Sequence, residues 1–140
     1  MRLKDRTAEA SLRVSLHEAA EGTRPAPKND IPAVLAPSRM IELMELAALR
    51  IMKPRLLEGE SSISVAMNVT YAAHTVVRGT VRAVATSGGT SGRLHRFTVH
   101  VFDESGLIGS GEHTRAVAVE RRLLVTAGIR SGNPGMLLDV

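Results

Sequence analysis

The chain has 140 residues, a length that suits one compact domain with a sizeable hydrophobic core. Hydrophobic residues make up 44% and charged residues 23% of the sequence, which is typical of a folded globular protein and unlike a disordered chain. Aromatic residues are only 2%, so there is little material for stacking nucleic-acid bases. The formal net charge is +4, but the lysines and arginines are scattered, which favours a solvated basic surface over a nucleic-acid patch.

Cysteine is absent, which excludes disulfides and thiolate metal sites. No apolar run approaches the roughly 18 residues of a membrane span. The N-terminal sequence MRLKDRTAEA lacks the apolar stretch of a signal peptide. We therefore expect a cytoplasmic protein that binds neither nucleic acid nor membrane.

The first predicted element is a strand over residues 11–17. In SLRVSLH the apolar residues Leu12, Val14 and Leu16 alternate with polar ones, as in a half-buried strand. Residues 21–32 follow, and their three prolines and one glycine predict a long loop.

The strongest periodic signal lies in residues 38–53, SRMIELMELAALRIMK. Its apolar residues recur at steps of three and four, which predicts a helix. Pro37 or Ser38 suits the start of this helix, Ser38 as a cap, and Pro54 marks its end. The helix is nearly apolar all round, so we expect it to be buried on most sides.

Four strand-like runs follow the helix, at residues 62–71, 79–86, 93–102 and 107–120. SGGTSG and DESG separate the last three runs and predict hairpins. A strand, a helix and four more strands joined by short turns predict an α+β fold in which an antiparallel sheet wraps around one long helix. Residues 123–140 are Gly-rich and aperiodic, so we expect an irregular tail after a core at about 10–122 in a single domain spanning 1–140.

Glu45 is the residue that an apolar helix does not explain. Its helical neighbours at three and four residues include no cation, whereas Glu42 has Arg39 three residues before it. Desolvation would raise the pKa of an unpartnered carboxylate there, and such a group can act as a general base or nucleophile. The alternative is that Glu45 lies on a solvated stripe of the helix or bonds to backbone at a subunit interface.

Three blocks of the sequence together resemble the fluoroacetyl-CoA thioesterase-like branch of the hotdog-fold thioesterases. They are AVLAPSRMIELMELAALRIMKPRLLEGE, VTYAAHT and GLIGSGEHTRAV, and the similarity runs from about Ile31 to Val119. The resemblance implies a homodimer, with a dimer of dimers as a further option, whose sheets join edge to edge and whose acyl-CoA pockets lie at the subunit interface. It implies no cofactor other than coenzyme A as part of the substrate.

In that family the chemistry is attributed to a helix glutamate, a hydroxyl residue just before the helix and a histidine at the end of the next strand. The glutamate position falls on Glu45. The hydroxyl position falls on Pro37, which has no hydroxyl, although Ser38 beside it can supply one. Pro37, at the hydroxyl position, and Thr75, which matches a threonine often found in the family, are expected to contact substrate.

The histidine position of the family falls on Tyr71. Tyrosine is a poor base at neutral pH, but its hydroxyl can donate a hydrogen bond to a thioester carbonyl or orient a water. His74 carries an imidazole, a side chain suited to acid–base chemistry, yet residues three apart in a regular strand face opposite sides. His74 therefore reaches the same pocket only if the chain bulges or turns after Tyr71.

The strand that contains GSGEHTRAV places Gly109, Gly111, His113 and Arg115 on one face. In the family these positions imply contacts with the acyl or pantetheine group. The alternative for the glycines is relief of crowding against the helix. Arg115 could contact a CoA phosphate, and the alternative is that it forms an exposed cross-strand ion pair.

The histidines show no metal-ligand spacing, with His95 and His100 on opposite strand faces, and we predict no metal. The first functional hypothesis is hydrolysis of an acyl-CoA by Glu45, with Ser38 or a helix-start N–H polarising the carbonyl and Tyr71 or His74 completing the site. The second is a hotdog protein that binds thioesters without cutting them, because Pro37 and Tyr71 replace two family positions. A dehydratase relative is a weaker third, since its His and Asp pattern is missing. Ile31 and Leu35 replace phenylalanines of the fluoroacetyl-specific enzyme, so its specificity is not transferred.

Overall fold

The central helix forms where the apolar period predicted it. The computed structural model describes residues 6–15 and 33–132, and in it α1 spans Pro37–Met52, followed by a 3₁₀ turn, η3, over Lys53–Arg55. Pro37 takes the first helical position, which suits a residue without a backbone N–H. The buried face consists of Met40, Leu43, Met44, Ala47, Ala48, Ile51 and Met52. The expectation of burial on most sides is wrong for one flank, where Glu42, Leu46 and Arg50 are exposed.

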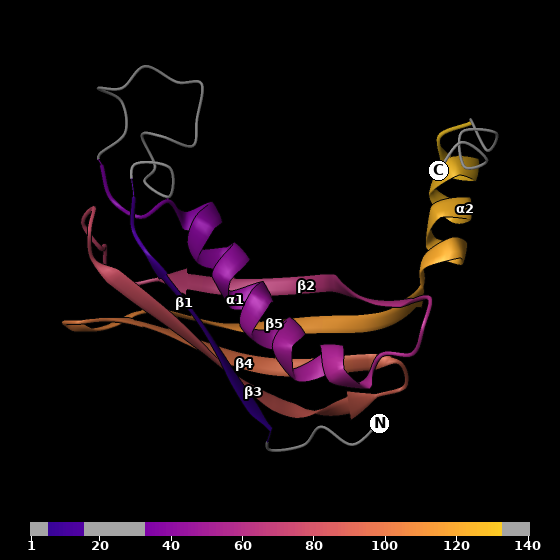
Figure 1. The fold of residues 1–140 in the computed structure, drawn as a ribbon, viewed down its shortest axis with the longest axis horizontal. Helices are drawn as coiled ribbons and strands as arrows, with labels where there is room; N and C mark the ends of the chain where they lie inside the picture. The colour runs from indigo at the N-terminus through magenta and orange to yellow at the C-terminus, as the bar shows by residue number, and fades with distance from the viewer. Residues whose placement is uncertain (1–5, 16–32, 133–140) are drawn as a thin grey trace.

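Within residues 6–15 and 33–132, five strands form one sheet in the order β1-β3-β4-β5-β2, and their pairings are all antiparallel. The strands are β1 Thr7–Arg13, β2 Glu60–Tyr71, β3 Thr80–Ser91, β4 Leu94–Asp103 and β5 Gly106–Val119. Figure 1 shows the sheet curling around α1, which lies across its concave face. The predicted α+β architecture and both hairpins are confirmed.

The first strand begins earlier than the sequence predicted. β1 pairs with β3 from Thr7 to Arg13, and Ala10 and Val14 are buried. Alanine is a weak strand signal, which explains why alternation alone did not reveal the first residues of β1. Leu16 and His17, at the end of the predicted strand, lie outside the described residues.

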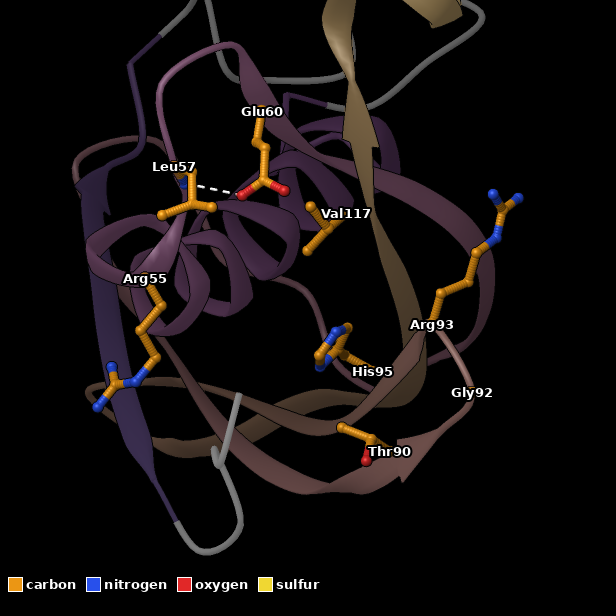
Figure 2. A pocket seen from close by; sticks show the side chains of 8 residues that line it. All are labelled: Arg55, Leu57, Glu60, Thr90, Gly92, Arg93, His95 and Val117. Carbon is orange, nitrogen blue, oxygen red and sulfur yellow. Dashed lines mark hydrogen bonds between the residues drawn. The ribbon is translucent and has the colours of Figure 1, made fainter.

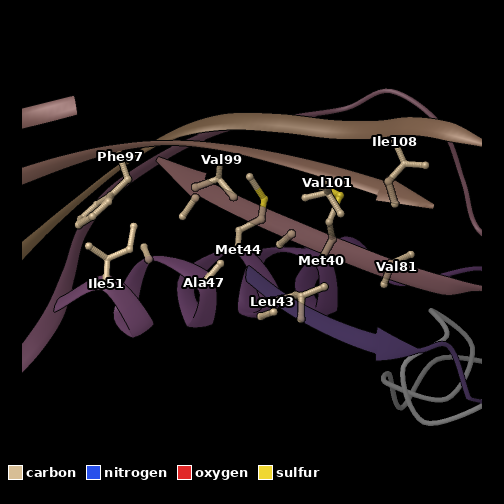
Figure 3. Close-up of a cluster of buried hydrophobic side chains, with 14 of the residues drawn as sticks. Met40, Leu43, Met44, Ala47, Ile51, Val81, Phe97, Val99, Val101 and Ile108 are labelled. Atoms are coloured by element: carbon tan, nitrogen blue, oxygen red, sulfur yellow. The ribbon is translucent and has the colours of Figure 1, made fainter. Parts of the chain in front are cut away.

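The core fills the space between α1 and the concave face of the sheet. Figure 3 shows the thioethers of Met40 and Met44 directed at the sheet, between the side chains of Val99, Val101 and Ile108. Phe97 closes one end of this layer. Flexible methionines suit this position because they fill irregular gaps between a helix and a twisted sheet.

Strand β2 contains a bulge at its centre, where the register with β5 shifts between Ser64 and Ala66. The extra residue, Val65, is half exposed. A bulge reverses the alternation of side chains beyond it, so residues on both sides of it face the helix with an odd spacing. Ser62, before the bulge, and Tyr71, after it, therefore point to the same face of the sheet.

The expectation of an irregular tail from residue 123 is wrong for its first part. Helix α2 spans Glu120–Arg130 and stands away from the sheet in Figure 1. Its apolar residues Leu123, Leu124, Val125 and Ile129 are exposed, so no strong amphipathic pattern revealed the helix. In the part of the chain that the structure describes, no helix is long and apolar enough to cross a membrane.

Candidate active site

Glu45 has a cationic partner that the helix sequence does not contain. Its carboxylate Oε2 lies 4.0 Å from Nη1 of Arg115, which β5 brings under the helix. The side chain of Glu45 is 37% exposed, so the carboxylate is neither buried nor fully solvated. The expectation of an unpartnered buried acid is therefore wrong, because the cation comes from a strand 70 residues further along. The neighbouring acid, Glu42, pairs with Arg39 at 2.8 Å as expected.

Arg115 is buried, with only 5% of its surface exposed. Its Nε donates to Oγ of Ser62 at 2.6 Å, and its Nη2 donates to the carbonyl oxygen of Ser62 at 2.8 Å. Its Nη1 lies 3.0 Å from Nε2 of His113, the inward residue two places before it. The expected exposed ion pair is therefore wrong, and Ser62 is a part of the cluster that no sequence motif indicated.

His113 is also enclosed, at 1% exposure, and its Nδ1 lies 3.1 Å from the carbonyl oxygen of Ala66. Burial is the main cause that lowers the pKa of His113, and the charge of Arg115 lowers it further. The hydrogen bond to Ala66 and the charge of Glu45 act in the opposite direction. Burial likewise lowers the pKa of Arg115 against the opposing charge of Glu45, and a guanidinium still remains charged at neutral pH.

A second group of predicted residues lies at the start of α1. Tyr71 donates its hydroxyl proton to the carbonyl oxygen of Leu35 at 2.7 Å. Burial raises the pKa of Tyr71, and the nearby charge of Asp103 raises it further, so this phenol is a donor and not a base at neutral pH. Ser38 is exposed and does not cap the helix, because the N-cap residue is Ala36 and no side chain among the described residues caps α1. The predicted capping role of Ser38 is wrong.

The chain turns directly after Tyr71, as a role for His74 required. The rings of Tyr71 and His74 stack with centroids 4.7 Å apart and planes inclined by 29°. Thr75 is buried and donates from Oγ1 to Asp103 at 2.8 Å, while its carbonyl oxygen accepts from the backbone N–H of Leu35. These contacts fix the end of β2 against the entry to α1.

Within one chain, the two groups are separate. Glu45 follows Pro37 by eight residues, which is about 12 Å along a helix axis. Among the described residues, no hydrogen bond, ion pair or ring contact joins Tyr71, His74 or Ser38 to Glu45. One protomer thus brings together Glu45, Arg115, His113 and Ser62, and places the other predicted residues at the start of the helix.

Gly109 and Gly111 face the helix from β5, and methionines fill the space in front of them. A Cβ on Gly109 would lie 2.7 Å from Sδ of Met40. A Cβ on Gly111 would lie 2.6 Å from the carbonyl oxygen of Asn68 and 3.1 Å from Cε of Met44. These contacts support close packing of helix and sheet as the reason for both glycines.

A pocket of about 700 Å³ opens next to the Arg115 cluster. His95 lines it and pairs in register with Arg115 on the neighbouring strand. Figure 2 shows the His95 ring near its centre and the side chains of Arg55 and Arg93 on opposite sides, with their guanidinium groups directed outward. The other lining residues are Leu57, Glu60, Thr90, Gly92 and Val117. Among the described residues, no group of three or more metal-ligating side chains is placed to hold an ion.

Comparison with known proteins identifies the fold and the family. A family model described as fluoroacetyl-CoA-specific thioesterase, FlK, matches residues 19–121. The chain belongs to this family. A fluoroacetyl-CoA thioesterase from Streptantibioticus cattleyicolor is 40% identical over 88 residues, which are 63% of this chain and 63% of that relative's length.

Solved structures confirm the hotdog fold. The fluoroacetyl-CoA thioesterase FlK superposes with a TM-score of 0.85 at 32% identity, covering 96% of this chain and 98% of that chain. A thioesterase superfamily member from Thermus thermophilus superposes with a TM-score of 0.79 at 26% identity, covering 91% and 90%. Structures of FlK variants contain fluoroacetate with CoA in one case and acetyl-CoA in another.

Proposed function

We propose that this protein hydrolyses an acyl-CoA thioester to a carboxylic acid and free CoA, with Glu45 as general base or nucleophile. The observation that carries the proposal is the carboxylate of Glu45, partly open to solvent and 4.0 Å from a buried guanidinium, in a fold of the thioesterase family. A carboxylate in this setting can take a proton from water or attack a carbonyl carbon itself.

Two routes fit this geometry. In the first, Glu45 removes a proton from a water molecule as the water oxygen bonds to the thioester carbon, and the CoA thiolate leaves. In the second, a Glu45 oxygen bonds to that carbon and expels the thiolate, and water then cleaves the resulting anhydride. Both routes place negative charge on the thioester oxygen in the transition state, where a nearby guanidinium or N–H group stabilises it.

A homodimer completes the site in this proposal. Strand β2 is an edge of the sheet, 12 residues long, with the apolar Val65 exposed near its centre. The unpaired N–H and C=O groups along a long edge can pair with the edge strand of another chain. A two-fold axis near Val65 would pair β2 with its copy and place Tyr71 of the partner subunit close to Glu60, two residues from Ser62. The residues at the start of α1 in one subunit would then approach Glu45 of the other.

The pocket beside Arg115 is the proposed site of the acyl or pantetheine group. Val117, two residues after Arg115 on the same face of β5, lines this pocket together with His95. Arg55 and Arg93 flank it and suit the phosphates of coenzyme A, because guanidinium groups bind phosphate oxygens well.

The second candidate is a thioester-binding protein without efficient hydrolysis. Pro37 has no hydroxyl for the role that the family gives to this position. The Tyr71 proton is already donated to Leu35 within the chain, so it is not free for a thioester carbonyl. These two observations favour binding without cleavage if Glu45 and Arg115 alone do not suffice.

Thiol release from a panel of acyl-CoAs separates the two candidates. We expect wild type to release thiol, Glu45→Ala and Glu45→Gln to lose about 10²-fold or more in kcat, and Glu42→Gln to match wild type. Glu42 is the matched control because it lies on the same helix but pairs with Arg39 at the surface. Equal rates for wild type and Glu45→Ala would remove Glu45 from the mechanism.

Saturable binding of an acyl-CoA without thiol release would instead support the binding protein. Where wild type does turn over, repeated turnover in ¹⁸O-labelled water tests the nucleophilic route. Label in the Glu45 carboxylate shows that route, with water attacking the Glu45 carbon of the anhydride, whereas its absence fits either the general-base route or attack of water on the acyl carbon of the anhydride.

A further inference from the structure

The guanidinium of Arg115 is held from three directions. Ser62 accepts from Nε and Nη2 through its hydroxyl and carbonyl oxygens, and His113 contacts Nη1. The Ser62 hydroxyl donates its own proton to Sδ of Met52 at 3.2 Å, which leaves its lone pairs for Arg115. All three nitrogens therefore have a partner before Glu45 is considered.

The contacts of His113 require one neutral tautomer. The carbonyl oxygen of Ala66 can only accept, so the proton of His113 lies on Nδ1. Arginine can only donate, so Nε2 must present a lone pair to Nη1 of Arg115. A proton on Nε2 would set two donors against each other at 3.0 Å.

These bonds limit how closely Arg115 approaches Glu45. Free arginine–carboxylate pairs commonly close to two parallel hydrogen bonds of about 2.8 Å. Here only Nη1 faces the carboxylate, and the distance is 4.0 Å. Within the described part of the chain, the Glu45 carboxylate accepts no hydrogen bond.

We propose that His113 and Ser62 are positioning residues that keep the Arg115 guanidinium beside Glu45 but short of a closed ion pair, which leaves the carboxylate oxygens available to react. The inference rests on the proposed function, since a free carboxylate matters only if Glu45 performs the chemistry. Loss of either anchor would let Arg115 close onto Glu45 or swing away from it.

The groups around His113 define its pH response. Arg115 from β5 and Glu45 from α1 are the charged groups that act on it, β2 contributes the Ala66 carbonyl, and β4 contributes the Phe97 ring at 6.4 Å. His95 of β4 lies opposite Arg115 in the register. Because burial lowers the pKa of His113 from its ordinary value, the imidazole is neutral at neutral pH and gains a proton only in acidic solution. That proton removes the acceptor for Arg115.

The test compares four variants with wild type. His113→Leu removes the acceptor, His113→Gln keeps an amide oxygen that can accept from Arg115, and Ser62→Ala removes one hydroxyl. Ser61→Ala is the matched control, because the Ser61 hydroxyl bonds to Glu120 outside the cluster. Thermal unfolding accompanies each assay, and Ser62→Ala, which deletes a single oxygen, carries the test if His113→Leu does not fold.

We expect His113→Leu to lower kcat by about 10²-fold and Ser62→Ala by about tenfold, with KM changed by less than about twofold. We expect His113→Gln to recover most of kcat and to lose the contribution of His113 to the acid limb of the pH profile. Ser61→Ala should match wild type. In wild type, ¹⁵N shifts of the His113 ring should show a proton on Nδ1 and none on Nε2.

A proton on Nε2 would overturn the inference whatever the activity. Unchanged kcat in His113→Leu and Ser62→Ala, alongside an inactive Glu45→Gln, would overturn the positioning roles and leave the proposed function standing. Absence of turnover by wild type on every acyl-CoA would overturn both.

Discussion

Replacing Gly111 with alanine tests whether the glycines of β5 serve packing or ligand binding. The new Cβ would lie 2.6 Å from the carbonyl oxygen of Asn68, a backbone atom of β2, the strand paired with β5. Relief requires the two strands to separate or slide. Forcing an extra carbon into a packed core costs about 1–3 kcal/mol, and alanine recovers about 0.4–1 kcal/mol by restricting the unfolded chain. The net expected loss is about 1–2 kcal/mol.

Gly109→Ala is the comparison, because its nearest clash is with a flexible side chain. The added Cβ would meet Sδ and Cε of Met40 at 2.7 and 2.9 Å. The flexible side chain of Met40 can rotate away from the new Cβ, and Met40→Leu replaces it with a shorter one. Met40→Leu should therefore restore the stability lost in Gly109→Ala. No matching change at Met44 should rescue Gly111→Ala, since the backbone oxygen remains.

The assay is thermal and urea unfolding of wild type, Gly111→Ala, Gly109→Ala and Gly109→Ala combined with Met40→Leu. The kcat and KM of each protein for an acyl-CoA are then measured. A loss of 1–2 kcal/mol corresponds to roughly 4–8 °C in Tm for a domain of this size. The packing argument fails if Gly111→Ala unfolds within about 1 °C of wild type while its KM rises several-fold, because the glycine would then serve the ligand.

Three further predictions address the dimer, a strained turn and the altered family position. Val65→Glu should give monomers in light scattering, because a two-fold axis near Val65 would bring the two new carboxylates close together. Leu107→Glu, beyond the end of β2, is the control and should keep the wild-type mass. If Val65→Glu remains dimeric, the interface lies elsewhere. Arg78 has a φ of 80°, a backbone conformation that glycine adopts more easily than arginine. Arg78→Gly should therefore raise the free energy of unfolding, measured in urea, by up to about 1 kcal/mol. An equal increase in Arg78→Ala would refute backbone strain as the cause. Tyr71→His should raise kcat about tenfold or more by supplying a base. Tyr71→Phe should lower the free energy of unfolding by about 1 kcal/mol, because it loses the hydrogen bond to Leu35, and should leave kcat within about threefold. A large kcat loss in Tyr71→Phe would show that the hydroxyl acts on substrate.

Local patterns in the sequence predicted the elements whose signals are local. Helix α1 began and ended within one residue of its predicted bounds, because its apolar spacing and flanking prolines are properties of that segment alone. Helix α2 was missed because its apolar residues do not gather on a buried face and because it contains Gly128, a residue with low helix propensity. The similarity to the family aligned Glu45 with the helix glutamate and Tyr71 with the histidine position, but it could not show which side chains contact them.

The cluster around Glu45 depends on contacts between distant segments. The rule of three- and four-residue spacing sees only cations on the same helix, whereas Arg115 arrives through the β5 register. Alternation correctly placed Arg115 and His113 on the same face, but not that both are buried and bonded to each other. Ser62 carried no signal, since a serine in an edge strand is ordinary.

The bulge in β2 connects the two halves of the proposed site. Ser62 and Tyr71 are nine residues apart, an odd spacing that puts them on opposite faces of a regular strand. The register shift between Ser64 and Ala66 turns both toward α1, where Ser62 anchors Arg115 and Tyr71 bonds to Leu35. Val65 also lies at the centre of the free edge, where a two-fold axis would join two copies of β2. The bulge therefore sets which side chains of β2 face the helix. It also lies where the partner strand would pair, so the site and the proposed interface share one strand.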